Sequence, residues 1–200
     1  KEQPMGTWLE LLDSARRRMK ANEALASRVK EYESSLSQKA IARYLPSLHG
    51  GDPERGKKVF LNKTETSCRR CHQVGNLKPT DPNVIAGPDL SDVGDRRDRE
   101  YLLRSIVDPN AEITESFQDW MVETKEDDIY RGRVVEEDDQ RVVMEVKEVG
   151  EPLARVTIDK KIITFRKREK SPMPEDVITK LSAHELRDLV AFLASQKLKK

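Results

Sequence analysis

The sequence has only two cysteines, and aromatic residues make up 5% of its 200 residues. No run approaches the eighteen or so apolar residues that a membrane helix needs, and the opening "KEQPMGTWLE" lacks the pattern of a secretory signal. Neither sign of charge is in excess, because the formal net charge is +1. General nucleic-acid binders carry a strong basic excess. We therefore expect a soluble chain with no membrane span and no nucleic-acid partner.

Residues 1–50 are predicted to form an N-terminal helical segment. No Pro or Gly interrupts the chain from Thr7 to about Leu45, and apolar residues recur there at the three-and-four spacing of amphipathic helices. This spacing predicts two helices. The stretch "PSLHGGDPERG" then concentrates helix breakers and predicts a domain boundary. The apolar positions are Trp8, Leu11, Leu12, Ala15, Met19, Leu25, Val29, Tyr32 and Leu36.

Three further helices are predicted after this boundary. Asp52 followed by Pro53 is typical of a helix start, and this helix leads toward the cysteines. The stretch "REYLLRSIVDPN" predicts a second helix that ends at Asp108, because the residue before a proline is pushed out of the helical region. Ser182 and Glu185 predict a capping box at the start of a terminal helix.

Between the second and third of these helices the period of the pattern changes to two. From about Phe117 to Arg166 apolar and polar residues alternate, with turn signals such as "KEDD" and "EEDDQ" between the runs. We expect four or five short antiparallel strands, so residues 114–166 form a small sheet or barrel inserted before the loop of Met173. The predicted fold class is mainly α with a β insert.

The stretch "SCRRCHQ", residues 67–73, holds both cysteines, Cys68 and Cys71, with His72 directly after them. In a C-x-x-C-H motif the thiols are one helical turn apart, so both can form thioether bonds to the vinyl groups of one haem. The following histidine is carried under the iron as its proximal ligand. The motif predicts one covalently attached haem c with its iron.

Three rival interpretations of the motif each need something that the sequence lacks. A thioredoxin-like pair follows a buried strand, whereas "NKTETS" before Cys68 is polar. A structural zinc site needs four ligands, and beyond the motif only the distant His49 and His184 could contribute. A disulfide between such close cysteines would close a tiny loop and leave His72 unexplained.

An electron-transfer haem needs a sixth ligand, and Met173 in "KSPMPED" is the strongest candidate. Prolines on both sides stiffen its loop, and a thioether ligand raises the reduction potential. Met173 could instead fill an apolar gap, and His49 or His184 could replace it if the loop folds differently. Met19 and Met144 fit ordinary core positions.

The stretch "AGPDLSDVG", residues 86–94, offers an acceptor for the second ring nitrogen of His72. A ligating histidine needs such an acceptor to fix its tautomer, and Pro88 has a carbonyl but no N–H of its own. A plain surface turn fits the same spacing.

Taken in order, several phrases over about Gly51 to Lys197 resemble the class I cytochrome c fold in its Planctomycete/Verrucomicrobium-type haem-binding domain. The phrases are "GDPERGKKVF", "CRRCH", "AGPDLSDVG", "YLLRSIVDPNAEI", "YRGRVVEEDD", "SPMP" and "LSAHELRDLVAFLAS". The resemblance implies a class I helical core, with residues 51–200 as the cytochrome c domain and residues 1–50 as an N-terminal helical extension. It also implies that His72 donates to Pro88, that Met173 is the distal ligand, and that Gly56 and Phe60 pack near Phe192.

Such domains lie at the C-terminal end of longer exported proteins, after helical repeats and often a propeller-type sugar dehydrogenase domain. The chain does not start with Met, so we expect a mature form or a piece of a longer protein. Attachment of haem to C-x-x-C-H resembles the bacterial maturation route outside the cytoplasmic membrane. The resemblance thus implies a periplasmic or extracytoplasmic location.

The expected function is single-electron transfer through a haem with His/Met ligation, and not catalysis by this domain alone. The redox partner would be an exported dehydrogenase, as a domain of the same longer chain or a separate protein, or a respiratory protein. A basic stretch from Lys160 to Lys170 could steer an acidic partner, although such runs are more often solvated. A haem-based sensor or a peroxidase-like protein with a labile distal ligand stays open as the alternative.

Overall fold

The computed structural model describes residues 8–35, 40–82, 84–147 and 151–198. The chain divides into two compact units, and each is built from separate parts of the sequence. The first unit comprises Lys1–Thr66, Asp92–Asp108 and Glu175–Lys200, and the second comprises Ser67–Ser91 and Pro109–Pro174. Among the helices of the described residues, none combines the length and apolar character that crossing a membrane requires.

The N-terminal part of the first unit contains the two helices that the apolar spacing predicts. Helix α1 (Trp8–Arg18) runs into the 3-10 turn η2 (Met19–Ala21), and α2 (Glu23–Ser35) follows. The break falls at Asn22, whose side chain accepts a hydrogen bond from the Leu25 amide at 3.0 Å and thereby caps α2. A longer 3-10 helix, η3 (Ala40–Ser47), precedes the breaker-rich stretch. Thr7 and Leu36 of the predicted pattern lie outside the described residues.

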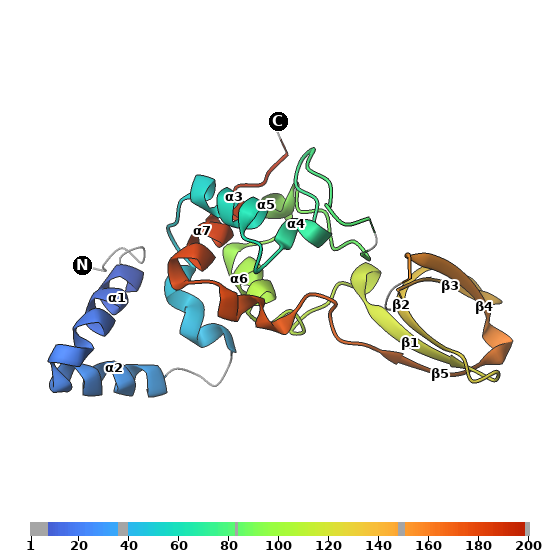
Figure 1. Ribbon diagram of the computed structural model, residues 1–200, viewed down its shortest axis with the longest axis horizontal. Helices are drawn as coiled ribbons and strands as arrows, with labels where there is room; N and C mark the ends of the chain where they lie inside the picture. Colours follow the sequence, from blue (N-terminus) through green and yellow to red (C-terminus); the bar gives the residue numbers. More distant parts are fainter. Residues whose placement is uncertain (1–7, 36–39, 83, 148–150, 199–200) are drawn as a thin grey trace. The chain divides into compact units, whose positions relative to one another are not determined.

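The rest of the first unit is built around α7 (Ala183–Ala194). Helices α3 (Pro53–Asn62) and α6 (Arg99–Val107) lie against α7 (Figure 1), together with the short α5 (Val93–Arg96), and the 3-10 helix η6 (Glu175–Lys180) contacts α6. The predicted caps are confirmed: Asp52 caps α3 with Pro53 in the first turn, and Ser182 and Glu185 form the capping box of α7. Helix α6 ends at Val107, and Asp108, the predicted end of this helix, is its C-cap.

Helices α3 and α7 cross closely because a glycine lies at their contact. A β-carbon on Gly56 would be 1.9 Å from the carbonyl oxygen of Asp188, so only glycine fits this position. One turn further along α3, the rings of Phe60 and Phe192 pack with their centroids 5.6 Å apart. Both rings are buried. The close approach lets these two aromatic side chains share the centre of the first unit.

A buried carboxylate on α7 links the same helices. Asp188 is 4% exposed, accepts a hydrogen bond from the Asp52 amide at 2.7 Å and pairs with Arg55 at 2.6 Å. Burial opposes ionisation of Asp188, but the Arg55 guanidinium and the Asp52 amide outweigh it and hold the pKa of this carboxyl below its usual value. The charged form therefore stabilises the folded state.

Removing this carboxylate should lower the free energy of unfolding of the first unit. It should also reduce the change of that free energy between pH 7 and pH 3. Because the folded-state pKa is depressed, the contribution of Asp188 is present above the unfolded value and is lost as pH falls below about 4. We expect Asp188→Asn to cost about 2 kcal/mol at pH 7. Urea denaturation at pH 7 and pH 3 measures both effects. Asp176→Asn, on the exposed side of η6, is the control, and equal pH dependence in both variants would contradict the assignment.

The second unit holds a five-stranded antiparallel sheet in the order β4-β3-β2-β1-β5 (Figure 1). Its core is made by Val122, Val142, Met144, Val146 and Ile158, of which none is more than 6% exposed. The same unit contains the short helix α4 (Cys68–Cys71) and the 3-10 turns η4 (Glu115–Phe117) and η5 (Lys160–Ile162). The strands are β1 (Asp119–Thr124), β2 (Ile129–Glu137), β3 (Arg141–Val146), β4 (Ala154–Asp159) and β5 (Ile163–Arg168).

The predicted fold class, a mainly α class I cytochrome c core with a small β insert, is wrong. Helices account for 46% and strands for 19% of the structure, and the longest described helix, α2, has 13 residues. The helices are short and scattered, since caps, prolines and glycines interrupt the helical pattern. The sheet has a buried core of its own and belongs to a separate compact unit. The chain is therefore a mixed helical and antiparallel-sheet protein.

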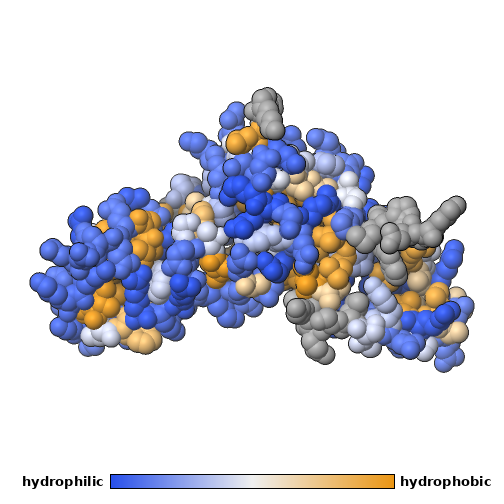
Figure 2. All heavy atoms as spheres, turned by 180° about the vertical axis from the view of Figure 1, so that it is seen from behind, coloured by the Kyte–Doolittle hydropathy of each residue, from blue (hydrophilic) through white to orange (hydrophobic). Residues whose placement is uncertain are grey.

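Hydrophilic residues cover much of the face seen in Figure 2. The large apolar side chains that remain exposed are dispersed over different elements, such as Leu11 on α1, Ile129 on β2 and Phe165 on β5. Single exposed apolar residues are ordinary on a protein surface.

Candidate cofactor site

The C-x-x-C-H motif folds as one helical turn. Helix α4 spans Cys68 to Cys71, and the His72 amide closes the turn by donating to the Cys68 carbonyl at 3.1 Å. Ser67, directly before it, has a positive φ of 47° and so starts the turn abruptly. Both cysteines are partly buried and form no disulfide. The two thiols and the imidazole are thus carried by five consecutive residues of a fixed turn.

A second segment, residues 86–91, runs beside the motif and is bonded to it. The Gly87 amide donates to the Cys71 carbonyl and the Leu90 amide to the Gln73 carbonyl, both at 2.9 Å. The Gln73 side chain also donates to Asp89 at 2.9 Å. Because backbone groups form two of these bonds, the segment lies in a defined register along the motif.

The segment fixes the orientation of the His72 imidazole. The Nδ1 atom of His72 lies 2.9 Å from the carbonyl oxygen of Pro88. A carbonyl oxygen only accepts, so Nδ1 carries the hydrogen and the neutral ring keeps its lone pair on Nε2. Burial lowers the pKa of His72, and the bond to Pro88 opposes this effect. A neutral imidazole with a free Nε2 lone pair is the form that binds a metal.

Gly87 provides the close packing against this ring. A β-carbon at Gly87 would lie 2.5 Å from Cε1 and 2.8 Å from Nδ1 of His72. The sequence had indicated only the carbonyl of Pro88 as a contact of His72. It did not indicate that Gly87 packs on the ring. The ring is therefore held by a hydrogen bond on its edge and by backbone on its face.

The environment of Cys71 does not suit a reactive thiol. Burial raises the pKa of Cys71, Arg70 opposes the shift, and Asp81 adds to it. Asp81 also pairs with Arg70 at 3.0 Å. Thioredoxin-like and nucleophilic cysteines have lowered pKa values instead. The raised pKa thus disfavours the redox-pair interpretation of the motif.

Met173 lies in a loop that has one hydrogen bond within itself and one to Asn110. The Met173 amide donates to the Ser171 hydroxyl at 3.2 Å, and the Ser171 amide donates to Asn110 Oδ1 at 2.8 Å. The Met173 side chain is partly buried. The predicted site residues Cys68, Cys71, His72, Pro88 and Met173 all belong to the second unit.

The alternative ligands have other surroundings. His184, on α7 of the first unit, has its Nδ1 atom 3.2 Å from a carboxylate oxygen of Asp13 on α1. His49 follows η3 in the same unit. Met144 is fully buried in the core of the sheet.

Acidic neighbours neutralise much of the basic stretch that precedes the Met173 loop. Lys160 and Arg166 both pair with Glu137, at 2.8 and 2.9 Å. The next two residues on β5 also have acidic partners, since Lys167 pairs with Glu169 and Arg168 pairs with Glu115. These pairs favour a solvated face over a basic docking surface for an acidic partner.

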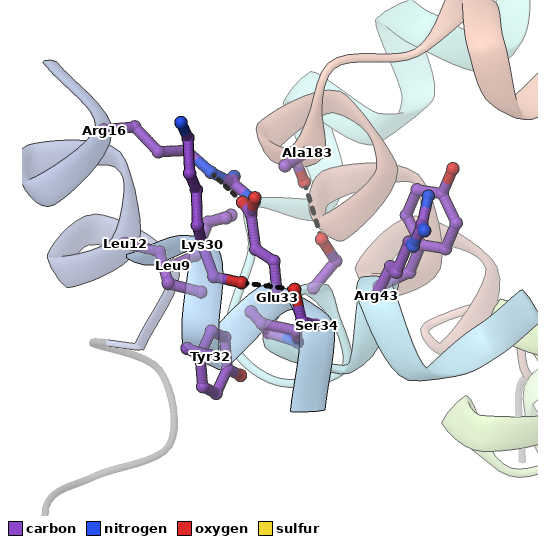
Figure 3. A pocket seen from close by; sticks show the side chains of 12 residues that line it. Leu9, Leu12, Arg16, Lys30, Tyr32, Glu33, Ser34, Arg43 and Ala183 are labelled. Atoms are coloured by element: carbon purple, nitrogen blue, oxygen red, sulfur yellow. Dashed lines mark hydrogen bonds and ion pairs between the residues drawn. The ribbon is translucent and has the colours of Figure 1, made fainter. Parts of the chain in front are cut away.

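A cavity of about 590 Å³ lies in the first unit, between α1, α2 and η3. Leu9 and Leu12 line one side, and an ion pair between Arg16 and Glu33 crosses it at 2.9 Å (Figure 3). None of the predicted ligands lines this cavity. Within the described residues, no group of three or more His, Cys, Asp or Glu side chains could hold a metal ion.

The residues of the second unit fit a covalently attached haem. The donor set consists of two thiols on one helical turn and an imidazole whose tautomer leaves Nε2 available. Gly87 lets the loop backbone pack directly against the His72 ring, where a β-carbon would be 2.5 Å from Cε1. In comparisons with known proteins, no family model and no curated protein matches the chain. The family resemblance therefore stays a prediction.

Proposed function

We propose that the chain is a c-type haem protein that transfers single electrons. Cys68 and Cys71 would hold one haem through two thioether bonds, and His72 and Met173 would ligate its iron. The observation that carries the proposal is the His72 imidazole, held on the Pro88 carbonyl at 2.9 Å and directly after both thiols. The proposal depends on this site and not on a class I fold.

When bound, the haem would supply an iron that changes between the ferric and ferrous states. The protein residues would keep the geometry constant during this change. Pro88 holds the hydrogen on Nδ1, so His72 presents the same nitrogen in both states. The Ser171 amide anchors the Met173 loop by donating to Asn110, and the Ser171 hydroxyl accepts from the Met173 amide. An anchored loop supports a permanent sixth ligand and therefore an electron carrier.

The proposed location is periplasmic or extracytoplasmic, since covalent attachment to C-x-x-C-H implies the maturation route outside the cytoplasmic membrane. An exported dehydrogenase or a respiratory protein would then be the redox partner. The basic stretch does not identify the surface on which this redox partner would dock, because its charges are paired with acidic neighbours.

Replacing Met173 tests both the ligand and the function. In protein matured with haem, we expect the ferric wild type to show the weak near-infrared band of sulfur-to-iron ligation, and Met173→Ala to lose it. The reduced wild type should also be indifferent to carbon monoxide, because its sixth position is filled. Absorption spectra of both oxidation states measure these properties. Met19→Ala, on the first unit, is the matched control.

Two results would contradict the proposal in different ways. A wild type without covalent haem after denaturing electrophoresis, or a Cys71→Ser variant that attaches haem as the wild type does, would refute the thioether assignment. A high-spin wild type that binds carbon monoxide readily would refute Met173 as a ligand and favour the peroxidase-like or sensor alternative.

A further inference from the structure

A buried arginine of the sheet contacts the loop that holds His72. Arg133, on the central strand β2, is 8% exposed, and its Nη1 donates to the Ala86 carbonyl at 2.6 Å. No motif or periodicity in the sequence singles out this residue. Its side chain reaches the segment whose backbone is bonded to Cys71 and Gln73.

The surroundings of the guanidinium satisfy it only in part. The Nε atom of Arg133 lies 3.9 Å from Asp119 Oδ1. Its Cζ atom lies 4.8 Å from the centroid of the Phe117 ring. Within the described residues, neither Nε nor Nη2 has a hydrogen-bond partner. A buried charge with unpaired donors is destabilising. The packing of the sheet alone therefore does not explain an arginine at this position.

The contact to Ala86 fixes one particular peptide group. The Ala86 carbonyl and the Gly87 amide belong to the same planar unit. Arg133 donates to the carbonyl oxygen of this peptide group. The N–H of the same group, which belongs to Gly87, donates to the Cys71 carbonyl at 2.9 Å. The peptide is thus held at one end by the sheet and at the other end by the second cysteine of the motif. A cationic donor on the oxygen also polarises the peptide and strengthens the bond that its N–H makes.

The orientation of this peptide determines the setting of the imidazole. Gly87 packs on the face of the His72 ring, and the next residue, Pro88, accepts the Nδ1 hydrogen. A rotation of the Ala86–Gly87 peptide would displace both groups. The three contacts form one chain from the sheet to the histidine.

We propose that Arg133 is a positioning residue through which the five-stranded sheet orients His72. The consequence for a haem rests on the proposed function, whereas the effect on the loop does not. Arg133 acts through the Ala86–Gly87 peptide, so its loss should loosen that peptide specifically. Removing its positive charge should also lower the reduction potential, because a nearby cation disfavours the ferric state.

Hydrogen exchange at the Gly87 amide, measured by NMR on the full chain, tests the effect on the loop. We expect Arg133→Gln to exchange about tenfold faster than the wild type, the factor that loss of one charge-assisted hydrogen bond gives. Arg133→Lys keeps the charge but loses the planar donor, and it should also exchange faster. If Arg133→Gln does not fold, Arg133→Lys decides the question. Arg131→Gln, an exposed arginine on the same strand, should match the wild type.

The midpoint potential of the matured protein provides the second readout. Arg133→Gln should have a lower potential than Arg131→Gln, while Arg133→Lys should retain most of the wild-type value. Unchanged Gly87 exchange in both Arg133 variants would overturn the proposal, even if haem attaches normally. A wild type that attaches no haem would refute the proposed function, and Gly87 exchange would still decide the role of Arg133.

Discussion

Replacing Gly56 with alanine is expected to reduce the free energy of unfolding of the first unit by about 3 kcal/mol, the upper end of the usual cost of overpacking. The added methyl group would lie 1.9 Å from the Asp188 carbonyl oxygen and 2.7 Å from the Phe192 β-carbon. Neither atom can rotate away, since one is backbone of α7 and the other is attached directly to it. The two helices would have to separate.

Separation of α3 from α7 would also weaken neighbouring contacts. The Phe60 ring, 2% exposed, would lose part of its packing on Phe192. The ion pair from Arg55 to Asp188 spans the same two helices at 2.6 Å. The steric effect therefore adds to a loss of apolar burial and of the ion pair that compensates the buried Asp188 carboxylate.

Intrinsic helix propensity predicts the opposite sign, which makes the experiment decisive. Alanine in a helix interior is favoured over glycine by about 1 kcal/mol. Urea denaturation followed by circular dichroism measures the change, with Lys57→Ala on the exposed side of α3 as the control. A Gly56→Ala variant as stable as the wild type would show that α3 and α7 do not approach as closely as described.

The features that the sequence predicted well are those whose signals are local. Asp52 with Pro53, and Ser182 with Glu185, define helix starts through side-chain bonds to amides two or three residues away. The alternating pattern predicted antiparallel strands, because side chains alternate between the two faces of a sheet. The C-x-x-C-H turn is local in the same sense.

The features that could not be predicted depend on contacts between distant segments. Arg133 meets Ala86 across 47 positions of the sequence, and no periodicity indicates this contact. Arg133 lies in the charge-rich stretch "YRGRVVEEDD", and an exposed arginine is the ordinary expectation. The packing of Gly56 on Asp188 likewise depends on how two helices cross.

The error in fold class has a related cause. The sequence predicted the strands but gave no measure of how far they would bury a core. Val122 on β1 and Val142 and Met144 on β3 are all fully buried in one cluster. The sheet therefore stabilises a unit of its own. A pattern along the chain shows which face of a strand is apolar, whereas the area buried follows only from the assembled sheet.

Replacing Gly87 with alanine is expected to have the largest effect on the candidate site. The new methyl group would lie 2.5 Å from Cε1 of His72 and 2.8 Å from Nδ1. A free side chain could rotate away, but the hydrogen bond to Pro88 holds this ring in place. Either the ring moves and loses that bond, or the loop moves and loses the bond from Gly87 to Cys71. Both outcomes disturb the imidazole that the proposed function requires.

In protein matured with haem, the variant should therefore lose the low-spin spectrum even where both thioether bonds form. We expect a high-spin ferric form that binds carbon monoxide after reduction, together with a loss of about 2 kcal/mol in stability from overpacking. Ala86→Ser is the matched control, because it adds one atom to the exposed neighbour in the same loop. A Gly87→Ala protein with the wild-type spectrum and stability would show that the ring of His72 does not lie against this glycine, and the geometry assigned to the proximal ligand would then be wrong.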